Sequence, residues 1–93
     1  MKNTSRKASD KLYIDTLLKD EHKTINLMSF GSGYHLRPHK ATSDVFFNVI
    51  EGKCSVRVLN ENLSLTAGEY TIFPKGQLHE VVAESALKIL LIK

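Results

Sequence analysis

The sequence predicts an all-β domain, a sandwich or barrel of short strands, and three observations favour that class. From Thr24 onward, apolar runs rich in β-branched and aromatic residues are separated by turn signals about every eight to twelve residues. The length of 93 residues leaves room for one domain. The composition, 42% hydrophobic and 25% charged, is that of a globular chain and excludes disordered, collagenous and membrane-spanning proteins.

The expected strands follow from these runs and the turns between them. The runs cover residues 24–30, 34–37, 45–50, 54–58, 63–65, 70–73, 80–83 and 86–92. The turn signals are Gly31-Ser32-Gly33, Pro38, Glu51-Gly52, Asn60-Glu61-Asn62, Ala67-Gly68, Pro74-Lys75-Gly76 and Glu84-Ser85. Side chains alternate between the two faces of a strand, so we expect Val45, Phe47, Val49 and Cys54 to point into the interior.

Residues 12–18 fit two interpretations. Tyr13, Ile14, Leu17 and Leu18 have the spacing of one helical face. Leu12, Ile14, Thr16 and Leu18 would equally form one face of a strand. We favour the strand, because the rest of the chain is β and because Ile14 and Thr16 are β-branched.

The run VFFNVI at residues 45–50 predicts a partner chain. A strand with one face in water alternates apolar and polar residues, and this run is apolar at nearly every position. One face would meet the opposing sheet, and the other, which includes Phe46, needs a second cover. We therefore expect a homodimer.

The net charge of +3 lies near the N-terminus and does not indicate nucleic-acid binding. Four basic residues within positions 2–11 face a single acidic one there, while the remaining nine basic and nine acidic residues cancel. We expect residues 1–11 to be a flexible basic leader and residues 12–93 to be the folded domain. No basic stripe with interleaved aromatic residues follows, so neither a nucleic acid nor a membrane is the expected partner.

The single cysteine, Cys54, excludes an internal disulfide and is typical of a reducing compartment. The N-terminal residues also lack the apolar run of a signal peptide, and no stretch approaches the ~20 apolar residues of a membrane span. Both observations favour a cytoplasmic location.

Part of the sequence resembles the cupin family. GEYTIFPKGQLH, from Gly68 to His79, is similar to the second cupin motif at every specified position up to the histidine, while Ala83 stands where the motif ends in Asn. RPHKATSDVFFNVIEG is similar to the first motif, a His-x-His pair, a Glu a few residues later and a Gly seven beyond, which Gly52 matches. The resemblance implies a double-stranded β-helix or jelly-roll barrel, usually dimeric, with a pocket at one mouth.

The family resemblance also implies which residues could hold a metal. Of the four usual ligands, His39 and His79 remain, and Arg37 stands at the first His of the pair. The Glu position falls on Asp44 when counted from His39 and on Val45 when counted back from Gly52. A third ligand for Zn, Fe, Mn or Ni would have to be Asp44 or His35.

Strand geometry limits that metal site. In a regular strand His35, Arg37 and His39 share a face, with His35 and His39 about 13 Å apart, so joint ligation needs irregular backbone. A cation at Arg37 would also oppose a divalent ion. The competing interpretation is that His39 and His79 are partly buried histidines that bond each other or the backbone.

Three functions remain open at this stage. The first is a binding protein whose apolar pocket, lined by Phe47, holds a small molecule such as a carboxylate with Arg37, His39 and His79 at its mouth. The second is a metal-dependent enzyme of oxygenase or isomerase type. The third is a structural or regulatory dimer with a vestigial pocket, because a fold of this kind hosts many functions.

Overall fold

In the computed structural model, residues 12–93 form nine antiparallel strands in two sheets; the expected leader, residues 1–11, lies outside the described residues. The strands are β1 Leu12–Lys19, β2 Thr24–Phe30, β3 His35–Lys40, β4 Val45–Glu51, β5 Lys53–Val58, β6 Glu61–Thr66, β7 Tyr70–Phe73, β8 Leu78–Ala83 and β9 Leu87–Ile92. The five-stranded sheet has the order β1-β2-β9-β4-β7 and the four-stranded sheet β3-β8-β5-β6. Within residues 12–93 no helix is long and apolar enough to cross a membrane.

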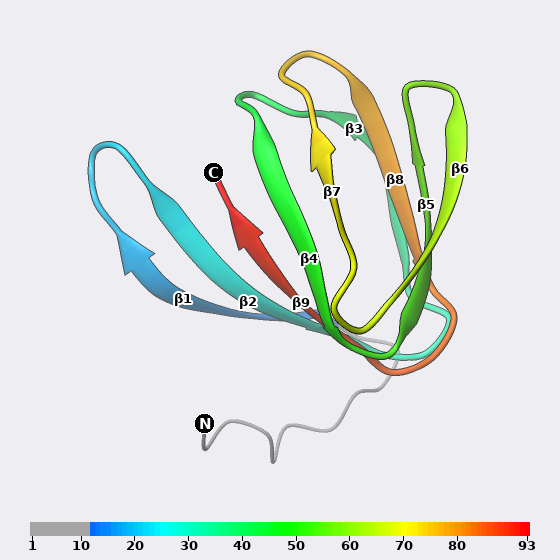
Figure 1. The fold of residues 1–93 in the computed structure, drawn as a ribbon. Helices are drawn as coiled ribbons and strands as arrows, with labels where there is room; N and C mark the ends of the chain where they lie inside the picture. Colours follow the sequence, from blue (N-terminus) through cyan, green and yellow to red (C-terminus); the bar gives the residue numbers. More distant parts are fainter. Residues whose placement is uncertain (1–11) are drawn as a thin grey trace.

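The two sheets face each other and have one narrow and one wide end (Figure 1). They converge where β4 turns into β5 and β8 turns into β9, and they diverge toward the β3–β4 and β7–β8 loops. We call these the closed end and the open end. The all-β class is confirmed, and the two antiparallel sheets form the expected jelly-roll barrel.

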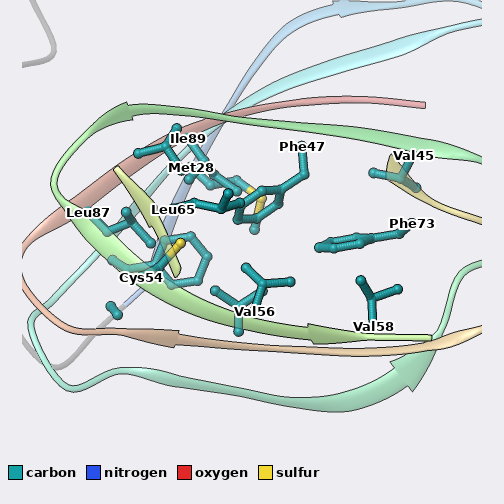
Figure 2. Packing of buried hydrophobic residues seen from close by; sticks show 14 of the residues in the cluster. Met28, Val45, Phe47, Cys54, Val56, Val58, Leu65, Phe73, Leu87 and Ile89 are labelled. Atoms are coloured by element: carbon teal, nitrogen blue, oxygen red, sulfur yellow. The ribbon is translucent and has the colours of Figure 1, made fainter. Parts of the chain in front are cut away.

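The core lies between the sheets and follows the period-two alternation of the strands. Val45, Phe47 and Val49 of β4 are at most 6% exposed. Figure 2 shows Val45 and Phe47 pointing inward, toward Val56 and Val58 of β5. Cys54 is fully buried among them, and burial raises the pKa of its thiol to about 11. Cys54 is therefore a core residue and not a reactive thiol.

Residues 12–18 form a strand, as the β-branched residues indicated. This strand, β1, pairs with β2 along its whole length, with a β-bulge between Thr16 and Leu18. The hairpin between β5 and β6 differs from its expected position. Its turn is the two-residue pair Leu59-Asn60, both at positive φ (53° and 61°), so β6 already begins at Glu61. Two positive φ values match the twist of the flanking strands, which explains the tight turn.

Gly52 holds the closed end together. Its φ is +92°, and a Cβ there would lie 2.1 Å from the carbonyl oxygen of Ala86. The β4–β5 turn and the loop before β9 can therefore approach this closely only with glycine at this position. The terminal glycine of the first motif thus has a structural reason.

Candidate functional site

A pocket of about 370 Å³ opens between the two sheets. Its lining is mainly apolar: Leu12, Ile14, Met28, Leu36, Val45, Phe47, Phe73, Ile89 and Leu91. The polar lining residues are Asn26, His39, Lys40, Thr42, His79 and Lys93. A pocket of this volume, apolar with a few polar groups, has the character of a small-molecule site.

Two histidines from neighbouring strands meet in this pocket. His39 of β3 and His79 of β8 are directly opposite each other in the strand register. Their ring centroids are 4.1 Å apart and the rings are inclined at 65°. His79 also stacks on Phe73, with centroids 4.2 Å apart and an angle of 11°. The motif resemblance therefore identified a pair of side chains that the fold brings into contact.

A β-bulge places this pair. Leu36 pairs with Val81 and His39 with His79, so three steps along β3 match two along β8. The additional residue turns His39 inward and leaves His35 on the outer face of the sheet. The expectation that His35, Arg37 and His39 share one face was therefore wrong, because it assumed a regular strand through Pro38.

His79 is buried, neutral and short of one partner. It is 5% exposed, and its Nδ1 makes no hydrogen bond within the described part of the chain. Burial, with a further contribution from the nearby His39, lowers the pKa of His79 to about 4, and an interaction with the backbone of Gln77 opposes part of this shift. A neutral imidazole is the form present at pH 7, and a buried nitrogen without a partner is a place for a ligand to bind.

His39 is exposed at the pocket mouth and has a fixed tautomer. Its Nδ1 lies 3.1 Å from the backbone carbonyl oxygen of Arg37. A carbonyl only accepts, so Nδ1 carries the hydrogen and donates it. In the neutral form the remaining ring nitrogen, Nε2, is therefore an acceptor, and after protonation it becomes a donor.

The other predicted site residues lie at different places. Phe47 lines the pocket as expected. Arg37 is exposed and is not among the residues that line it. His35 pairs with Glu80 through its Nε2 on the outer face of the four-stranded sheet. Asp44 accepts a hydrogen bond of 2.8 Å from the backbone N–H of Lys75.

The positions of the four predicted ligands show whether they could bind one metal ion together. His39 and His79 supply two nitrogen donors, and neither His35 nor Asp44 joins them. Among residues 12–93 no group of three His, Cys, Asp or Glu side chains could hold a metal ion. Protein sites for Zn, Fe, Mn or Ni use three or four protein ligands, so this donor set does not fit a metal held by the chain alone.

Sequence reasoning missed the two lysines that line the pocket, Lys40 and Lys93. Lys40 pairs with the exposed Leu78, so it borders the pocket from a register position on the outer side of β3. Lys93 was within reach, because Leu87, Ile89 and Leu91 point inward and the same alternation continues to residue 93. Its backbone is held by two hydrogen bonds to Thr24, 2.9 and 2.6 Å long.

Residues 26–93 match the family described as Cupin domain. The chain belongs to the cupin family. A search of curated proteins gives no match to the chain.

Solved structures share the fold, two of them described as cupins. A cupin 2 conserved barrel domain protein from Leptotrichia buccalis is 28% identical, with a TM-score of 0.88 over 99% of this chain and 45% of its own. A cupin superfamily protein from Desulfitobacterium hafniense is 16% identical, with a TM-score of 0.88 over 95% and 81%. A conserved protein of unknown function from Streptococcus pyogenes is 22% identical, with a TM-score of 0.82 over 89% and 73%. These similarities establish the fold. The ligand has to be inferred from the residues of the pocket.

Proposed function

We propose that this cupin domain binds a small organic anion, a monocarboxylate with a short apolar body, in the pocket between its sheets. The observation that carries the proposal is the buried His79, whose Nδ1 has no partner among the described residues although the side chain lines the pocket. An unpaired buried polar atom is destabilising by about 1–3 kcal/mol, and a ligand atom that bonds it recovers that loss.

The polar groups of the pocket favour an acid over a neutral ligand. Lys40 and Lys93, both exposed, are among the lining residues, and no Asp or Glu side chain is among them. A carboxylate next to these groups is stabilised by charge-assisted hydrogen bonds, which are about twice as strong as neutral ones.

The apolar residues that line the pocket favour a ligand with an alkyl or aryl group beside its carboxylate. Phe47, Phe73 and Ile89 are among the lining residues and at most 1% exposed, and the ring of Phe73 stacks on His79. An alkyl or aryl group there would leave water for an apolar surface, a gain of about 25 cal/mol per Å². Arg37 has no part in this proposal, because the lysines line the pocket in its place.

An NMR titration with hexanoate, and with hexanamide as its neutral counterpart, tests the proposal. We expect hexanoate to bind and to shift the signals of His79 and Phe47, and hexanamide to bind at least about tenfold more weakly. His79→Leu should weaken hexanoate binding at least about tenfold. His22→Ala, a change in the exposed β1–β2 turn, is the matched control and should leave it unchanged.

The same titration separates the alternatives. Equal affinity for the acid and the amide would contradict an anion site, and no binding of either probe would favour the vestigial pocket. The metal-dependent enzyme has its own test, in which Zn²⁺, Mn²⁺, Ni²⁺ and Fe²⁺ are added without an organic probe. One equivalent bound by the wild type and lost in His39→Ala/His79→Ala would favour that function instead.

A further inference from the structure

The pocket has a second polar side chain of interest, Asn26, on the sheet that faces the histidine pair. Asn26 lies in β2 of the five-stranded sheet, whereas His39 and His79 lie in the four-stranded sheet. Asn26 pairs directly with Leu91, and Leu91 pairs directly with Phe47. Directly paired residues project from the same face of a sheet, and all three line the pocket. The amide of Asn26 is therefore on the inner face, across the pocket from the histidines.

A hydrogen bond from the neighbouring strand orients this amide. Thr16 of β1 is directly paired with Asn26, and its Oγ1 donates to Asn26 Oδ1 over 2.9 Å. The amide oxygen thus has its partner. Within residues 12–93 the two hydrogens of Asn26 Nδ2 make no hydrogen bond. An amide nitrogen only donates, so this wall of the pocket offers a donor to a ligand.

Apolar surface separates the donor from His79. The ring of Phe73 stacks on His79 with centroids 4.2 Å apart, and it lies 5.0 Å from the ring of Phe47. Phe47 and Asn26 are two strands apart, because β9 lies between β4 and β2, which is about 10 Å at about 4.8 Å per strand. A ligand with its carboxylate at His79 therefore meets Asn26 with the other end of its body.

We propose that the acid bound in this pocket carries an oxo group on its apolar body and that Asn26 Nδ2 donates a hydrogen bond to that oxygen. The inference rests on the proposed anion site, because the carboxylate has to lie at the histidine end. An oxo oxygen accepts a hydrogen bond and carries no charge, so it suits a single donor in a mainly apolar lining. The ligand class is an oxo monocarboxylate.

The size of the pocket and the groups around Asn26 agree with such a ligand. At about 30 Å³ for each water-sized group, a volume of about 370 Å³ has room for roughly twelve groups, and hexanoate has eight heavy atoms. Asp15, the carboxylate next to Thr16 on β1, pairs with Leu27 and so lies on the opposite face from Asn26. Lys93 also lines this wall but is exposed, whereas Asn26 is half-buried, so water competes less for the amide.

A titration with three acids that share one carbon skeleton tests the inference. The acids are hexanoate, γ-oxohexanoate and δ-oxohexanoate, and the readout is the ratio of the affinity for an oxo acid to that for hexanoate. We expect at least one oxo acid to bind the wild type about fivefold more tightly than hexanoate, which is the effect of one net hydrogen bond.

Two variants assign this ratio to Asn26. Asn26→Asp keeps the size of the side chain and an acceptor for Thr16, but an ionised carboxylate cannot donate, so the ratio should fall to about one. The new charge should weaken all three acids alike, and for this reason the ratio is compared and not the affinity. Asn62→Asp makes the same substitution at an exposed position of β6, outside the pocket, and should keep the ratio of the wild type.

The outcomes separate this inference from the proposed anion site. Hexanoate that binds as tightly as both oxo acids would overturn the inference and leave the anion site intact. No binding of any of the three acids would overturn both. A ratio in Asn26→Asp equal to that of the wild type would also overturn the inference. Circular dichroism checks that the variants are folded, and Asn26→Leu, which removes the donor without adding a charge, takes the place of Asn26→Asp if that variant is unfolded.

Discussion

The closed and open ends of the sandwich are built from different chemistry. At the closed end, Gly52 lies against Ala86, and the nearby Cys54 and Leu87 are at most 2% exposed. At the open end, the same two sheets carry a pocket and a histidine with an unpartnered nitrogen. The closed end is held by packing within the chain, whereas the open end has a buried nitrogen atom that a ligand could bind. The comparison teaches that stability and binding are located apart and can be changed separately.

The largest expected effect is at the closed end. Gly52→Ala should lower the free energy of unfolding by about 3 kcal/mol or more, because the new Cβ would lie 2.1 Å from the Ala86 oxygen at a φ of +92°. Urea denaturation measures this loss. Gly33→Ala is the control, with a φ of +84° but open space around the new Cβ, and should cost about 1 kcal/mol. Equal losses in the two variants would show that the close approach of Gly52 to Ala86 does not determine the stability of the closed end.

The next effect is the dependence of stability on pH that His79 introduces. The pKa of His79 is about 4 in the folded protein and about 6.5 when unfolded, so between these values the unfolded chain binds one more proton. Unfolding free energy should therefore fall as pH is lowered from about 6.5 to about 4, by up to about 3 kcal/mol. Urea denaturation of metal-free protein across that range measures it. His79→Leu should remove most of the decline and His35→Gln should keep it; a decline of the same size in His79→Leu would assign it to other groups.

A smaller effect on stability is expected from His79→Leu at pH 7. The substitution removes the unpartnered nitrogen and also the stacking on Phe73, so the free energy of unfolding should change by no more than about 1 kcal/mol. Hexanoate binding should still fall at least about tenfold. A loss of stability as large as that of Gly52→Ala would mean that His79 is a structural residue. The open end would then contribute to stability as the closed end does.

The smallest effect is expected on the outer face of the four-stranded sheet. Glu80→Gln removes the ion pair with His35, whose side chain is 47% exposed, and should cost less than about 1 kcal/mol. Hexanoate affinity should not change, because this pair lies on the opposite face of the sheet from the pocket. A change in affinity above about threefold would mean that the two faces are coupled through β3 and β8.

Much of the fold could be predicted from the sequence because strand alternation is local. Val45, Phe47 and Val49 point inward as their spacing indicates, and the β-branched residues near the N-terminus form a strand. The motif histidines His39 and His79 also meet as directly paired residues.

The remaining part of the site depended on one irregularity. A bulge beside Pro38 changes which side chains of β3 point inward, and parity counting has no means of detecting it. For this reason His35 and Arg37 were placed toward the site. Lys93 was missed for a different reason, since the expected strand ended at residue 92 although the alternation of Leu87, Ile89 and Leu91 continues to residue 93.

The central claim is that the buried Nδ1 of His79, in the neutral tautomer that carries its hydrogen there, donates a hydrogen bond to the carboxylate of the ligand. Imidazole ¹⁵N NMR of histidine-labelled protein at pH 7, with hexanoate added stepwise, measures that nitrogen directly. The account predicts a saturable shift of the His79 Nδ1 resonance that hexanamide does not reproduce at the same concentration. A His79 Nδ1 resonance that stays in place at saturating hexanoate would contradict it.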